Sequence, residues 1–396
     1  MTDTGQAYHP PLYYVMAAPL LAIFGTEKAV QSLSLILSIG TLVILYILIF
    51  TSGFVRGRLS QLYSFLMVCF LPQFVKYTLY VSNDTLAIFL GALIVWQCRR
   101  FILAPQWKES LLLAILTGLG LLTKATFLAY VPVLFALVAF MFIQKASLAK
   151  AIWAASAFLV VVLIVGSYKF VDNFERFHDP LVSNLDLPAE EFIEQKTHYM
   201  GLRSYLDFNI ISLIKSPTTS WRIDPNYSVP GYPALLYATF FYSYGAESNF
   251  TGNLHWPFKY LGSLTYVAGL LPTIVFLVGL AGLGKNLSRF IKTFNFNNSD
   301  ECLELCVYVA VCLLASNCVL LFVTVLKYHV WTIMQSRLLF PSMMGIIGAF
   351  EAGIEIVRRN TKVMSMLNIS MFSLVVLFSL YLLSEVGHQI VLRLLN

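Results

Sequence analysis

The chain has 396 residues, of which 58% are hydrophobic and only 12% are charged. Soluble domains carry about a quarter charged residues, so this composition excludes an ordinary soluble protein. Apolar stretches of roughly 18 or more residues recur, as in membrane-spanning helices, whereas the alternating segments of a transmembrane barrel do not occur. We therefore expect an all-α, polytopic transmembrane helical bundle. The net charge of +6 does not indicate nucleic acid, and we expect no nucleic-acid partner.

The chain opens with MTDTGQAYHPPLYY, which directly precedes a short apolar run. A residue before proline is pushed out of helical geometry, and a proline fits the first turn of a helix. We therefore expect His9 and Pro10 in an extended entry and Pro11 at the start of a helix. This helix, over 11–25, is short for a spanning segment, so we expect an interfacial or half-inserted helix on the outer side.

Ten further apolar helices follow, and we expect each of them to cross the membrane. In chain order they cover 32–53, 61–75, 84–98, 109–123, 125–144, 149–169, 260–283, 302–326, 337–357 and 364–384. We divide the chain into a transmembrane part over 1–169, a loop over 170–259 and C-terminal transmembrane helices over 260–396. The loop mixes acidic residues with aromatic stretches, which is typical of short amphipathic helices on a membrane surface.

Lys and Arg gather in alternate connections between the predicted helices. These connections cover 54–60, 99–108, 145–150, 284–301 and 358–363. Alternate connections fall on one side of a membrane, and short positive loops stay in the cytoplasm. We therefore expect these five connections in the cytoplasm, and both termini and the loop over 170–259 on the outer side.

Ionisable and polar residues cluster at the predicted outer ends of the helices. An ionisable group at the membrane edge is energetically expensive, which makes it a functional candidate. Several at one interface suggest a site for a charged substrate. The candidates are His9, Asp84, Lys124, His329 and Arg337.

Two interpretations remain open for most of these residues. Asn83 or Asp84 could be the N-cap of a helix, or Asp84 could be a carboxylate for a cation or a substrate hydroxyl. Lys124 could extend to the interface or hold a phosphate as a point charge. Arg337 begins a helix, where a cation opposes the helix dipole, and this favours an anion-binding role.

The six cysteines lie in or beside apolar runs, which is typical of small buried hydrophobic residues. Their spacing indicates neither a disulfide framework nor a zinc site. The sequence therefore identifies no cofactor, and a divalent metal stays open as one candidate.

Four segments in order carry a family resemblance: HPPLYY, NDTLAIFL, GLGLLTKATFLAYVP and QSRLLFP. From residue 8 to about 345 the chain resembles the GT-C superfamily of polytopic glycosyltransferases, of the protein mannosyltransferase and aminoarabinose transferase kind, including the RgtA/B/C/D-like group. The resemblance implies transfer of a pentose or hexose from a polyprenyl-phosphate donor to an extracytoplasmic lipid, glycan or protein acceptor. It also implies a bacterial inner-membrane protein among membrane lipids, with its active face outside.

The same resemblance gives the candidate residues their expected roles. Asp84 matches an acidic residue that supports catalysis, and an apolar groove is expected to hold the isoprenoid chain. The candidate substrate-binding residues are His9, Tyr13, Lys124, His329 and Arg337.

The chain departs from the family pattern at its start. Family members begin with a cytoplasmic end, a spanning helix and an outer loop that carries an Asp, whereas this sequence starts just before HPPLYY. We therefore expect an N-terminally truncated chain that can be inactive as it stands. Two other functions stay open: a transporter or flippase of lipid-linked anions, and a scaffold subunit that kept the fold without the chemistry.

Overall fold

The computed structural model describes residues 10–182, 186, 205–215, 231–242, 258–328 and 335–395. These residues form helices and connections without any strand, which confirms the predicted all-α class. His9 and His329 lie outside the described residues, as does most of the predicted loop over 170–259.

The first half of the chain folds into short and long helices in close succession. They are α1 (Leu12–Phe24), α2 (Glu27–Tyr46) with the π-helical turn η1 (Ile47–Thr51), α3 (Arg58–Phe70), α4 (Pro72–Thr78), α5 (Asn83–Leu103), α6 (Trp107–Leu121), η2 (Ala125–Ala129), α7 (Tyr130–Lys145), α8 (Leu148–Gly166) and α9 (Tyr168–Phe177).

In the described residues of the second half, two short helices precede four long segments, the third of which is η7 followed by α14. They are α10 (Ile210–Lys215), α11 (Tyr232–Phe241), α12 (Phe258–Thr293), α13 (Ser299–Tyr328), the 3₁₀ segment η7 (Ser336–Ser342), α14 (Met343–Val357) and α15 (Thr361–Leu395). Segment η7 runs directly into α14, so the two form one continuous apolar unit.

Within the described part of the chain, eight helices are long and apolar enough to cross a membrane, where the sequence predicts ten. The predicted span over 61–75 is divided, because α3 ends at Phe70 and Pro72 begins the separate helix α4. A proline lacks the backbone N–H that a continuous helix needs, and it fits a helix start instead. The predicted span over 109–123 is the 15-residue helix α6, which rises only about 22 Å, less than a hydrocarbon core of about 30 Å.

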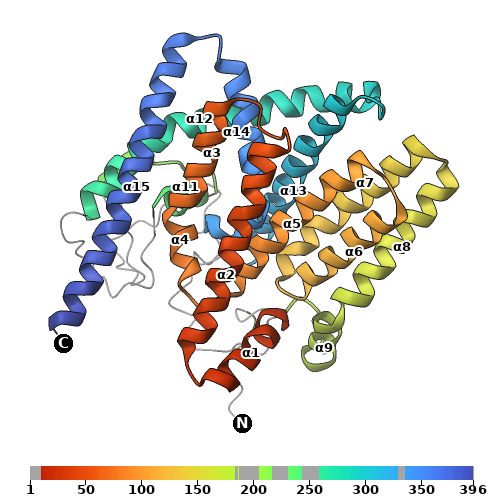
Figure 1. Cartoon of the computed structure of the whole chain (residues 1–396), viewed down its shortest axis with the longest axis horizontal. Helices are drawn as coiled ribbons and strands as arrows, with labels where there is room; N and C mark the ends of the chain where they lie inside the picture. The colour runs from red at the N-terminus through yellow and green to blue at the C-terminus, as the bar shows by residue number, and fades with distance from the viewer. Residues whose placement is uncertain are drawn as a thin grey trace.

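The connections that are rich in Lys and Arg come together at one end of the bundle. Figure 1 shows the turns after α2, α12 and α14 along the upper edge, whereas α1, α9 and the end of α15 lie along the lower edge. One hydrogen bond joins two of these connections, since Lys145 Nζ donates to Pro105 O at 3.0 Å. Another joins the connection over 54–60 to α14, where the Arg56 amide donates to Glu351 Oε1 at 3.2 Å. The assignment of this end to the cytoplasm stays a prediction.

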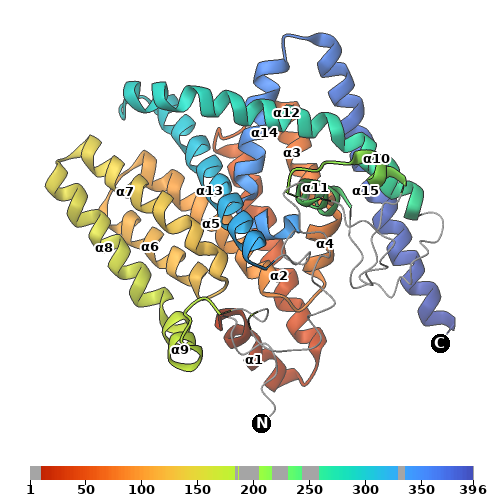
Figure 2. The ribbon, with the colours of Figure 1, turned by 180° about the vertical axis from the view of Figure 1, so that it is seen from behind.

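Helix α1 is a short apolar helix at the lower end of the bundle, seen from both sides in Figures 1 and 2. Pro11 directly precedes it, and the Pro11 carbonyl accepts the Val15 amide at 2.9 Å. The Leu12 amide donates to Leu122 O at 2.9 Å, so the start of α1 is tied to the end of α6. Gly25 ends the helix with φ +66°, a left-handed conformation that glycine adopts without strain.

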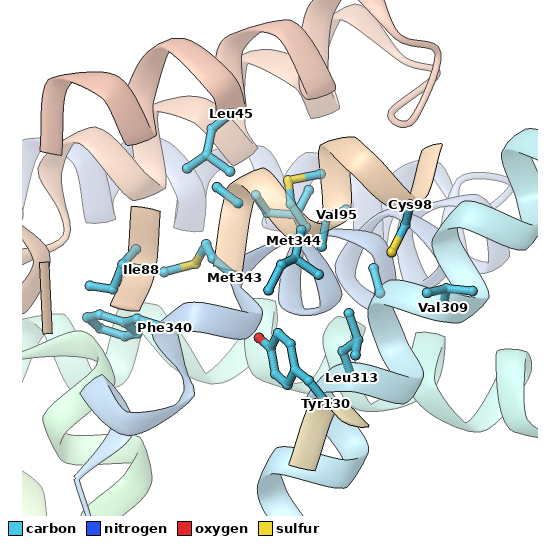
Figure 3. Packing of buried hydrophobic residues seen from close by; sticks show 14 of the residues in the cluster. Leu45, Ile88, Val95, Cys98, Tyr130, Val309, Leu313, Phe340, Met343 and Met344 are labelled. Carbon is cyan, nitrogen blue, oxygen red and sulfur yellow. The ribbon is translucent and has the colours of Figure 1, made fainter. Parts of the chain in front are cut away.

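Helix α5 is the central element of the core and contacts α2, α6, α13 and η7. Figure 3 shows Ile88, Val95 and Cys98 of α5 among side chains from these neighbours, including Phe340 and Met343 from η7 and α14. All five side chains are buried. Because the middle of α5 is enclosed by protein, all residues from Leu86 to Val95 are apolar.

Glycines allow two backbone contacts that determine the helix spacing. A Cβ on Gly91 would lie 2.1 Å from the Pro341 carbonyl oxygen, and one on Gly279 would lie 1.8 Å from the Ala349 carbonyl oxygen. Small residues let membrane helices approach until their backbones touch. The first contact joins α5 to η7, and the second joins α12 to α14.

Candidate functional site: a charged cluster at one end of the bundle

Asp84 occupies the first turn of α5 and is not the N-cap of that helix. Ser82 is the N-cap, and its Oγ accepts the Asp84 amide at 3.1 Å. A carboxylate in the first turn is favoured by the helix dipole, and the Asp84 side chain is only 8% exposed. Since Ser82 serves as the cap, the Asp84 carboxylate remains available for other partners.

Lys124 is the first of two basic residues that contact this carboxylate. It lies in the extended connection between α6 and η2, where its amide donates to Gly120 O at 2.8 Å. From there Lys124 Nζ donates to Asp84 Oδ1. Asn83 Nδ2 donates to Thr123 O at 3.4 Å and joins the same two segments, so the pair is supported by a neighbouring polar contact.

Arg337 is the second basic residue and comes from a distant part of the chain. Its Nη1 lies 3.8 Å from Asp84 Oδ2, and its guanidinium group lies over the Tyr77 ring at 4.7 Å from the centroid. The Arg337 side chain is 20% exposed, and its Nε atom is buried without a hydrogen-bond partner among the described residues. Arg337 therefore retains an unused donor next to Asp84.

Segment η7, which carries Arg337, is held by polar contacts from three helices. The Ser336 amide donates to Thr239 Oγ1 at 2.9 Å, and Ser336 Oγ donates to Gln73 Oε1 at 3.4 Å. On the other side, Asn317 Nδ2 donates to Leu338 O at 3.0 Å. The first and third of these bonds satisfy backbone groups of a short 3₁₀ segment inside a membrane protein, where unpaired groups are costly. The three bonds hold η7 in place and thereby determine the position of Arg337.

Tyr13, a predicted substrate-binding residue, is wholly buried in the structure. Its hydroxyl group shares a hydrogen bond of 2.8 Å with Ser34 Oγ, and Thr85 Oγ1 donates to the same Ser34 Oγ at 3.4 Å. Burial raises the pKa of Tyr13 above its usual range. Through Ser34, Tyr13 links α1 to α2 and to Thr85 of α5, the residue next to Asp84.

Two aromatic residues near the cluster were not identified from the sequence. Tyr14 has a raised pKa, first because of burial and second because of the negative charge of Asp84. Tyr77 of α4 lies against the Arg337 guanidinium group. Only the position of Tyr14 beside the predicted residue Tyr13 could have indicated it, since the sequence does not show how α4 is oriented.

The cluster has an excess of positive charge. Lys124 and Arg337 carry two positive charges, and Asp84 carries one negative charge. An arginine fork and a lysine point charge are the groups that proteins use to bind phosphate. The described residues contain no group of three or more His, Cys, Asp or Glu side chains arranged to hold a metal ion. The chemistry that the described side chains offer is anion binding next to a carboxylate.

A large apolar cavity lies beside the cluster. It has a volume of 730 Å³ and is enclosed by α3, α11, α12, α13, η7 and α14. Ser336, the residue next to Arg337, forms part of its wall, together with apolar side chains such as Leu71, Phe240, Phe276 and Met343. A long hydrocarbon chain fits such a lining.

Comparison with known families gives one finding about the first part of the chain. Residues 8–168 match the family model described as dolichyl-phosphate-mannose-protein mannosyltransferase. This confirms the resemblance predicted from the sequence and supports a membrane glycosyltransferase. The matched segment contains Asp84 and Lys124, whereas Arg337 lies beyond it. Together with the eight apolar helices, the match supports an integral membrane protein. No curated protein and no solved structure matches the chain.

Proposed function

We propose that this protein transfers a pentose or hexose from a polyprenyl-phosphate donor to a hydroxyl or amine group of an extracytoplasmic lipid, glycan or protein. The observation that carries the proposal is the contact of Asp84 with both Lys124 and Arg337 beside the apolar cavity. The family match supports glycosyl transfer and a lipid-linked donor in general terms.

The two basic residues are suited to the leaving group of this reaction. When the acceptor oxygen bonds to the sugar carbon, the bond from that carbon to the phosphate oxygen breaks. The phosphate oxygen keeps the electron pair and gains negative charge. Lys124 and Arg337 would stabilise this charge in a partly buried site, where fixed positive groups act more strongly than in water.

Asp84 is suited to the proton of the acceptor. The acceptor O–H or N–H must lose its proton as the new bond forms, and a nearby carboxylate can take it. The Asp84 carboxylate lies between the two cations that would hold the phosphate, so it is positioned near the reacting groups. The proton then resides on the carboxyl group, and polyprenyl phosphate is released from the cavity.

The position of the charges favours an interfacial enzyme over a transporter. Transporters place their substrate groups near the midplane, between related halves of the protein. Here the charged side chains come from the first turn of α5, the connection before η2 and the first turn of η7, which are all ends of elements. We place this end on the outer face of a bacterial inner membrane, in agreement with the charge pattern of the connections.

The test is a transfer assay with the full chain purified into nanodiscs. Undecaprenyl phosphate linked to radiolabelled pentoses or hexoses is incubated with membrane extract as acceptor source, and released undecaprenyl phosphate is measured. We expect release with the unchanged chain and its loss in Asp84→Asn and Arg337→Ala. The matched control is Asp172→Asn, since Asp172 of α9 is also paired with two cations, Lys169 and Arg176. Release by both Asp84→Asn and Arg337→Ala at the rate of the unchanged chain would refute the site.

A further inference from the structure

Both carboxylate oxygens of Asp84 are engaged in the structure, each by a different cation. Lys124 contacts Oδ1, and Arg337 Nη1 lies 3.8 Å from Oδ2. The carboxylate therefore occupies the space between the two groups that the proposed function assigns to the donor phosphate. A phosphate that binds to the same two cations needs the space that the carboxylate now fills.

The remaining contacts of Arg337 restrict where another anion can bind. The Tyr77 ring covers one face of the guanidinium group, and Nε is buried without a partner among the described residues. The guanidinium nitrogen that lies near Asp84 is Nη1, at 3.8 Å from Oδ2. An anion that binds at Nη1 between the two cations must compete with Asp84 for that place.

We infer that Asp84 is a resident counter-ion, which the donor phosphate displaces from Lys124 and Arg337 and thereby frees for the acceptor. The inference rests on the proposed function. A sugar–phosphate–isoprenoid diester carries one negative charge, the same as the carboxylate, so the two cations keep one anionic partner through the exchange. The carboxylate then turns from the cations to the acceptor proton.

This exchange gives the reaction an order. Without donor, the ion pairs occupy Asp84, and an acceptor hydroxyl finds no free carboxylate. With donor bound, the cations hold phosphate and the carboxylate is released within reach of the sugar. The donor therefore binds first, and the acceptor reacts second.

The test is a binding measurement that does not depend on catalysis. Farnesyl phosphate, an isoprenoid monophosphate, is titrated into the full chain in nanodiscs, and its Kd is measured by calorimetry. Removing the competing charge should tighten binding in Asp84→Asn by about tenfold, which corresponds to the weakest coupling measured for close charge pairs. Lys124→Gln and Arg337→Gln should weaken binding, and Asp172→Asn should leave the Kd unchanged.

The outcomes separate the inference from the proposed function. If Arg337→Gln weakens binding but Asp84→Asn leaves the Kd equal or higher, the counter-ion role is refuted and the donor site stands. If Lys124→Gln and Arg337→Gln both leave the Kd unchanged, the donor site itself is refuted.

A second measurement uses only the unchanged chain, in case Asp84→Asn does not fold. A hydrophobic carbodiimide modifies accessible carboxyl groups, and mass spectrometry follows the modification of Asp84. Farnesyl phosphate should increase the rate at Asp84 several-fold and leave the rate at Asp172 unchanged. A rate at Asp84 that stays the same or falls would refute the displacement.

Discussion

Replacing Gly91 by alanine should separate the two halves of the charged cluster without touching a charged residue. The added Cβ would lie 2.1 Å from the Pro341 carbonyl oxygen, whereas ordinary van der Waals contact begins at 3.4 Å. Segment η7 must therefore move away from α5 by about 1.3 Å. The opposing atoms belong to the backbone of η7, so no side-chain rotation can relieve the clash.

The movement acts directly on the ion pair between Arg337 and Asp84, which is already 3.8 Å long. Overpacking of this kind costs about 1–3 kcal/mol of stability, and a misplacement of about 1 Å at a reacting centre can lower the rate by about 10²-fold. We expect Gly91→Ala to lose transfer activity by about that factor and to unfold at a lower temperature.

The assay compares Gly91→Ala with Gly284→Ala in the same nanodiscs. Gly284 of α12 has no atom within 4 Å of an added Cβ, so this control inserts the same methyl group where there is space. Transfer rates and thermal unfolding are measured for both variants. Full activity in Gly91→Ala would show that the α5–η7 contact does not determine the geometry of the site, and our account of η7 would be wrong.

Three further predictions concern single side chains. Lys124→Gln should lower kcat by about 10²-fold, the loss that follows removal of one preorganised donor to a developing negative charge, and an unchanged kcat would contradict this role. Tyr77→Leu should raise the donor KM several-fold with little change in kcat, since a cation–π contact of about 0.5–2 kcal/mol orients Arg337; a change in kcat alone would argue against it. The hydrogen bond from Lys169 lowers the pKa of Asp172. This pair therefore stabilises α9 at pH values above the ordinary pKa of Asp, and the stabilisation disappears as the pH falls through the lowered pKa. The protection factors of the α9 amides, which correct for the pH dependence of intrinsic exchange, should fall on acidification, less so in Asp172→Asn. The same acid response in both would refute the assignment.

The sequence predicts much of the helical framework, because helices that cross a membrane need long apolar runs and the connections between them carry the charged residues. The predicted helix over 125–144 corresponds to η2 and α7, and the one over 149–169 corresponds to α8 and the start of α9. The break at Pro72 was missed although proline is a known helix breaker, since the apolar run continues through it.

The site was predictable in its charges and not in its contacts. Asp84, Lys124 and Arg337 were identified because ionisable residues at membrane edges are costly. The contact of one carboxylate with both cations requires η7 to pack against α5. This packing brings Arg337 to Asp84, which lies 253 positions earlier in the chain. The contact of Gly91 with Pro341 and the Tyr77 ring on Arg337 depend on tertiary packing, which no local pattern contains.

Single-turnover transfer from radiolabelled undecaprenyl-phosphate sugars, with donor binding measured in parallel, separates binding from chemistry at the charged cluster. The unchanged chain should bind the donor and release undecaprenyl phosphate. Asp84→Asn should bind the donor more tightly and release no undecaprenyl phosphate, whereas Arg337→Gln should fail to bind the donor. Equal release by the unchanged chain and Asp84→Asn, or donor binding that is unchanged in Arg337→Gln, would contradict the roles proposed for Asp84 and Arg337.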